Sequence, residues 1–125
     1  MSQSWSDIVA FYRDLPRKEE GEPTWQAIRG IEALAQHIEQ SPRLSRLQGW
    51  TSMLDLCIRQ TGEAPYAGPF LRVSPLSSGK VEFRYLDTSI AARQWHREVP
   101  SAETIARFLR FLDQLRWFGG SSVVE

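Results

Sequence analysis

Two short segments of this 125-residue chain alternate between apolar and polar side chains, and only the five residues PLSSG separate them. The segments are residues 70–74 and 80–86, and the separating loop ends in Gly79. An alternation of period two is typical of a strand with one buried face and one solvated face. The pattern therefore predicts an antiparallel hairpin with a medium-length loop. Its apolar face consists of Leu71, Val73, Val81, Phe83 and Tyr85.

Two further segments are candidates for strands of the same sheet. Residues 93–99 alternate again, with Trp95 and Val99 on the expected core side, and Pro100 ends the pattern. Residues 50–60 fit either a helix, which would group several apolar side chains on one side, or a strand. We predict a strand there, because polar and apolar side chains alternate from Leu54 to Arg59 and the following chain is rich in β patterns.

Helices are predicted on the N-terminal side of these strands. Ser4 is a typical helix-capping residue, and Pro16 ends the short amphipathic segment that follows it. Thr24 is expected to cap a second helix, in which Gly30 indicates close packing against a neighbour. A further short helix should start at Ser41-Pro42. The apolar stripe of the second helix consists of Trp25, Ile28, Ile31, Leu34, Ala35 and Ile38.

The C-terminal helix is predicted over residues 101–118, capped by Ser101 and closed by Gly119-Gly120. Its apolar arc is wider than one neighbour can cover. We therefore expect the sheet on one side and, on the other, either the N-terminal helices or a second subunit in a two-fold dimer. The first seam consists of Ile105, Phe108, Leu109 and Leu112, and the second of Phe111, Leu115 and Phe118.

Together these patterns predict a single α+β domain over residues 1–125. Its sheet is an antiparallel meander of three to four strands, packed on one face by N-terminal helices and by the C-terminal helix. Residues 1–49 form the helical part, 50–100 the sheet, 101–118 the last helix and 119–125 a tail.

Charge and cysteine content narrow the class of protein. Fifteen basic residues balance fifteen acidic ones, so neither a nucleic acid nor a membrane surface is expected as a partner. Thirteen of the basic residues are arginine, and asparagine is absent, which we attribute to a GC-rich bacterial genome. The lone Cys57 excludes an internal disulfide, and no secretory pattern precedes the first helix. We expect a bacterial cytoplasmic protein.

The residues with catalytic or metal-binding chemistry are few. His96 and Glu98 share one strand face, but a metal site would need a further ligand such as Asp55 or Glu82. Cys57, His96 and Glu98 are the right types for a nucleophile, a base and an orienting group. Whether their strands are neighbours is not readable from the sequence. No cofactor and no metal is predicted.

The surface offers better candidates, because tryptophan and arginine are the residues most enriched at interface hot spots. The polar side of the predicted sheet carries Arg72, Arg84 and His96 as candidate binding residues. Arg72 faces either Glu82 or Arg84, depending on the hairpin register, and facing arginines would need an acidic partner. Trp117 is either a cap over the core edge or an exposed anchor.

These observations favour a small non-catalytic protein-interaction domain of the inhibitor, immunity or accessory type. Its partner would be another protein, bound through surfaces that contain arginine and tryptophan, and it would also pair with itself through the C-terminal helix. The alternative is a small enzyme or ligand-binding protein with a pocket near Cys57 and His96. Convergence of those two side chains in one concave site would favour this alternative.

Overall fold

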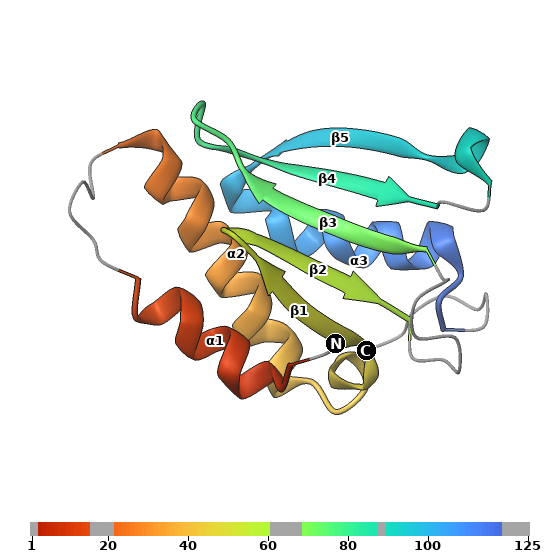
Figure 1. Cartoon of the computed structure of the whole chain (residues 1–125), viewed down its shortest axis with the longest axis horizontal. Coiled ribbons are helices and arrows are strands. Elements are labelled where there is room, and N and C mark those ends of the chain that lie inside the picture. The colour runs from red at the N-terminus through yellow and green to blue at the C-terminus, as the bar shows by residue number, and fades with distance from the viewer. Residues whose placement is uncertain (1–2, 16–21, 61–68, 88–89, 119–125) are drawn as a thin grey trace.

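The computed structural model describes residues 3–15, 22–60, 69–87 and 90–118, which form three α-helices and five strands (Figure 1). The helices are α1 (Trp5–Arg13), α2 (Pro23–Gln40) and α3 (Thr104–Leu115). The strands are β1 (Gln48–Ser52), β2 (Asp55–Arg59), β3 (Phe70–Pro75), β4 (Lys80–Leu86) and β5 (Trp95–Pro100). Three short 3-10 turns, η1 (Leu44–Arg46), η2 (Ala91–Arg93) and η3 (Ser101–Glu103), connect them.

The sheet is an antiparallel meander in the order β1-β2-β3-β4-β5. The β3–β4 hairpin lies where the alternation predicts it, and Gly79 takes a positive φ of 92° in its turn. The choice of a strand over a helix for residues 50–60 is confirmed, but the segment contains two strands in place of one, namely most of β1 and all of β2. The two strands meet in a turn at Met53, which adopts the left-handed conformation with φ 57°. The sheet thus has five strands in place of three to four.

The helices cover one face of the sheet, so the α+β prediction is confirmed (Figure 1). The central strands bury the apolar side of each alternation against α2 and α3. Trp95 is the exception among the predicted core residues, because it lies on the edge strand and is half-buried. The fully buried side chains of this sheet face are Leu56, Ile58, Leu71, Val73, Val81, Phe83 and Val99.

The N-terminal part follows the predicted order with two corrections. The short helix predicted from Ser41-Pro42 is only the turn η1, which starts at Leu44. Ser4 caps α1 as predicted, with its Oγ accepting a hydrogen bond from the Asp7 N–H at 3.0 Å. Thr24 is not the cap of α2, because the helix already begins at Pro23, whose missing N–H costs nothing at the first helical position. Gly30 marks a close approach, since a Cβ there would lie 2.9 Å from Thr104 Oγ1.

The C-terminal helix is shorter than predicted at both ends. Residues 101–103 form the turn η3, and α3 ends at Leu115. Arg116 adopts the left-handed conformation with φ 57°, and the Trp117 N–H then bonds back to the Leu112 carbonyl at 3.3 Å. This reversal turns the Trp117 side chain into the protein, where it is buried. The predicted closing pair Gly119-Gly120 and the tail 119–125 lie outside the described residues.

The second apolar seam of α3 is largely covered within the chain. Phe111 is buried, with its ring centroid 5.0 Å from that of Phe83 and 4.9 Å from that of Trp95. The sheet therefore covers a side chain for which we expected a dimer partner or the first helix. Two-fold pairing stays a prediction, without the uncovered aromatic seam that motivated it.

None of the helices within the described ranges is long and apolar enough to cross a membrane.

Candidate functional site on the open sheet face

The face of the sheet opposite the helices, which we call the open face, carries most of the candidate residues. The strand register aligns one residue from each strand in a row across it, and a second row lies beside the first. The first row consists of Trp50, Cys57, Arg72, Arg84 and His96, and the second includes Ser52, Asp55, Ser74, Glu82 and Glu98. Charged side chains thus gather on the three central strands.

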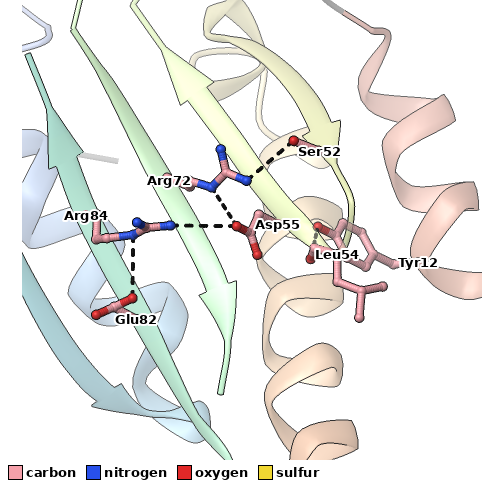
Figure 2. Close-up of polar contacts among 7 residues, drawn as sticks. All are labelled: Tyr12, Ser52, Leu54, Asp55, Arg72, Glu82 and Arg84. Carbon is pink, nitrogen blue, oxygen red and sulfur yellow. Dashed lines mark hydrogen bonds and ion pairs between the residues drawn. The ribbon is translucent and has the colours of Figure 1, made fainter. Parts of the chain in front are cut away.

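The hairpin register places Arg72 directly opposite Arg84, and not opposite Glu82. The acidic partner that such a pair requires is Asp55 on β2 (Figure 2). Arg72 Nε donates to Asp55 Oδ2 at 2.6 Å, and Arg72 Nη2 donates to Ser52 Oγ at 3.4 Å. The Asp55 hydrogen bond raises the pKa of Arg72 further, so this guanidinium is held firmly in its charged form.

Arg84 is held much more loosely than Arg72. Its Nη2 lies 3.8 Å from Asp55 Oδ2, and its Nε lies 3.5 Å from Glu82 Oε1 (Figure 2). Both distances exceed the roughly 2.7–2.9 Å of a charge-assisted hydrogen bond. Nε itself is buried and makes no hydrogen bond with any residue of the described ranges. The side chain as a whole is 39% exposed and is therefore accessible to a ligand in part.

Cys57 lies beneath these arginines and is fully buried, although its strand position belongs to the open face. Burial raises the pKa of the thiol to about 11, an effect that the nearby Arg72 and Arg84 charges oppose and the Asp55 charge reinforces. A thiol with this pKa is protonated at neutral pH and is a poor nucleophile.

The structure does not bring Cys57 and His96 together. Arg72 and Arg84 lie between them in the same row, so three strand spacings separate them. At about 4.8 Å per spacing this is roughly 14 Å, far beyond hydrogen-bond reach. The nucleophile and base considered from the sequence are therefore separate side chains with separate surroundings.

His96 and Glu98 share the open face as expected, and His96 Nδ1 lies 3.7 Å from Glu82 Oε2. Asp55, the other ligand considered for a metal, lies on β2, three strands from β5, and is engaged with Arg72. No group of three metal-ligating side chains occurs among the residues that the structure describes. The geometry thus supplies no metal-binding cluster around His96.

A hollow of about 340 Å³ lies at one end of β4 and β5, next to η2. It brings together two of the predicted binding residues, Arg84 and His96. Tyr85 and Trp95 also line it, but their rings lie on the helix side of the sheet, where they stack with centroids 5.7 Å apart. The remaining lining residues are Leu86, Ala91 and Gln94. A pocket near Cys57 and His96 was the alternative considered from the sequence, but this hollow includes only His96 of the two and depends on how η2 returns the chain to β5.

Trp117, the fourth predicted binding residue, is not an exposed anchor. Its side chain is only 6% exposed, and its carbonyl accepts a hydrogen bond from Gln60 Nε2 at 2.8 Å. Together with Arg43 and Phe118 it borders a separate hollow at the end of α3. Trp117 therefore caps the core edge, which is the other role that the sequence allowed.

No protein-family model, no curated protein and no solved structure matches this chain. The class that its fold defines is the small α+β protein with an antiparallel meander sheet. Its function is argued from the open face alone.

Proposed function

We propose that this protein is a small non-catalytic protein-interaction domain of bacterial origin, of the inhibitor, immunity or accessory type, which binds another protein through the open face of its sheet. Arg84 carries the proposal. It is a half-exposed arginine whose ion-pair distances of 3.5 and 3.8 Å leave hydrogen-bonding capacity for a partner. Arginine in such a setting is characteristic of interface hot spots.

Two further observations support an interaction surface over a catalytic one. The candidate nucleophile Cys57 is fully buried and protonated, and it does not line the hollow that contains His96. The described helices lie on the opposite side of the sheet, so the charged face is accessible to a large ligand (Figure 1). Arg72 then serves as the fixed element of this surface, and Arg84 and His96 as its contact residues.

The proposal is tested by capture of partners from lysate of the source cells, with the protein immobilised through a tag. Wild type, Arg84→Glu and Arg110→Glu are compared, because Arg110 is an exposed arginine of α3 on the other side of the sheet. We expect one protein to be retained by wild type and Arg110→Glu and lost with Arg84→Glu, and the purified pair to bind in a calorimeter. Equal capture by all three variants would contradict a role for the open face.

A further inference from the structure

We propose that the hollow beside Arg84 and His96 recognises a carboxylate, supplied by an aspartate or glutamate side chain of the partner protein; this inference rests on the proposed function and names the chemistry of its contact. The hollow is formed by the end of β4, the turn η2 and the start of β5. Arg84 and His96 lie directly opposite each other in the β4–β5 register, so their side chains project from the open face as neighbours.

The first argument is charge. Among the described residues that line the hollow, the basic ones are Arg84 and His96, and none carries a carboxylate. Glu82, which lies 3.5 Å from Arg84 Nε and 3.7 Å from His96 Nδ1, is not a lining residue, and neither is Asp55, which lies 3.8 Å from Arg84 Nη2. An incoming carboxylate would therefore compete at Arg84 and His96 only with ion pairs that are longer than a charge-assisted hydrogen bond.

The second argument is hydrogen bonding. A guanidinium has five N–H donors in a planar fork, and a carboxylate can accept two of them in parallel. Arg72 uses its donors on Asp55 and Ser52, with the shorter bond at 2.6 Å. Arg84 Nη2 lies 3.8 Å from the same Asp55 oxygen, which is too far for a strong hydrogen bond. The unequal division of Asp55 thus leaves Arg84 as the guanidinium with donors to offer.

The third argument concerns access to the hollow. Tyr85 and Trp95 also line it, but their rings lie on the helix side of the sheet, where they stack with each other and Trp95 packs against Phe111 at 4.9 Å between ring centroids. On the open face the side chains of Arg84 and His96 are therefore the ones that a ligand meets. His96 is 71% exposed and stands at the opening, on the edge strand β5. A side chain on a partner surface can therefore reach Arg84 past His96.

The experiment uses nuclear magnetic resonance on the full chain and two blocked peptides, acetyl-GEEEG-amide and its uncharged twin acetyl-GQQQG-amide. We expect the glutamate peptide to shift the Arg84 Nε–H and His96 ring resonances saturably, and the glutamine peptide to leave them unchanged. Arg84→Gln should weaken binding by about tenfold or more, as loss of a charge-assisted contact does. Arg110→Gln, on the helix side, should bind like wild type.

Sodium acetate forms a third arm of the titration. Acetate binding as tightly as the peptide would support the carboxylate site but assign it to a free small acid, which overturns the assignment to a protein side chain. Equal shifts with both peptides, or unchanged binding by Arg84→Gln, would overturn the carboxylate site itself. If Arg84→Gln does not fold, Arg84→Lys replaces it, and we expect weaker binding because lysine lacks the fork.

Failure of this inference is distinguishable from failure of the proposed function. Loss of partner capture with Arg84→Glu, combined with no response to the glutamate peptide, would leave the interaction function standing and reject the carboxylate chemistry. A peptide response that requires Arg84, without any captured partner, would leave the carboxylate site standing and reject the interaction function.

Discussion

Arg72 and Arg84 face each other across the β3–β4 hairpin, and both guanidinium groups reach the same carboxylate oxygen, Asp55 Oδ2. Like charges directly opposite each other on adjacent strands destabilise a sheet unless an opposite charge lies between them. Asp55 supplies that charge unequally, at 2.6 Å from Arg72 Nε and 3.8 Å from Arg84 Nη2. Asp55 thus holds Arg72 in place by a short hydrogen bond, whereas Arg84, which it holds less closely, is the arginine that we propose for binding.

Replacing Asp55 with Asn should destabilise the fold, because Arg72 loses its charged partner and the two arginines are no longer neutralised. Hydrogen bonds to charged groups contribute roughly 1.5–3 kcal/mol, and we expect a loss of free energy of unfolding within that range. Urea unfolding at pH 7 measures it. The matched control is Glu98→Gln, an exposed residue of the same face, for which we expect a change under about 0.5 kcal/mol. Equal effects of the two substitutions would show that the Asp55 contact adds nothing.

Cys57 should react slowly with alkylating reagents in the native protein. Its pKa of about 11 and its full burial both reduce the concentration of accessible thiolate. Compared with a free thiol of pKa about 8.5, the thiolate fraction at pH 7.5 is lower by roughly 300-fold. The rate of iodoacetamide labelling, followed by mass spectrometry with and without urea, checks this. Fast labelling of the folded protein would revive the interpretation of Cys57 as a nucleophile.

The β3–β4 hairpin and its faces were predictable, because alternation depends on side-chain types that are visible along the chain. Its register was not, since PLSSG permits Arg72 to face either Glu82 or Arg84. The loop hydrogen bonds fix the choice, with the Leu76 N–H on the Lys80 carbonyl and the Gly79 N–H on the Leu76 carbonyl, each at 3.0 Å. Such bonds depend on backbone geometry, which the residue types did not specify.

Two of the features that sequence reasoning missed share a physical cause. Met53 and Arg116 both adopt the left-handed conformation, which residues without glycine's freedom rarely take. Neither carries a turn signal, so the β1–β2 hairpin and the reversal that buries Trp117 were not predicted. The separation of Cys57 from His96 depends on strand order, which comes from the whole sheet. Arg72, Arg84 and His96 were identified correctly as residues of one face, because period two settles that locally.

Stability should fall as the solution becomes alkaline. The pKa of Cys57 is raised by burial to about 11 in the folded protein, and burial also raises that of Tyr12, with Asp55 and Cys57 charges adding to it. An acid whose pKa is higher in the folded than in the unfolded protein stabilises the fold at pH values below its unfolded pKa. This stabilisation is lost as the pH rises from the unfolded pKa to the folded pKa.

The window for Cys57 is therefore from about pH 8.5 to pH 11. We expect the free energy of unfolding to fall by about 2 kcal/mol from this group between pH 8 and pH 10.5. Urea unfolding at several pH values measures the slope, and Cys57→Ala should make it shallower. An identical slope in Cys57→Ala would mean that the thiol titrates alike in the folded and unfolded chains.

Gly49 is expected to tolerate no side chain, because Trp5 of α1 lies against it. A Cβ at this position would lie 2.6 Å from Trp5 Cη2 and 2.7 Å from Cζ2. The indole cannot move aside freely, since its Nε1 donates to the Leu47 carbonyl at 2.8 Å and the side chain is buried. Alanine normally stabilises a strand relative to glycine. Here overpacking should reverse the sign, and Gly49→Ala should cost about 1–3 kcal/mol.

A double-mutant cycle with Trp5→Phe tests the cause of that cost. Phenylalanine lacks the outer indole atoms that would clash, so Gly49→Ala should cost less in the Trp5→Phe background than in wild type. Trp5→Phe also removes the hydrogen bond from Trp5 to Leu47, but it does so with either residue at position 49, so this loss cancels in the coupling energy. Free energies from urea unfolding of the four proteins give the coupling energy. Additive effects would place the cost of Gly49→Ala in the strand backbone and not in the contact between Trp5 and β1.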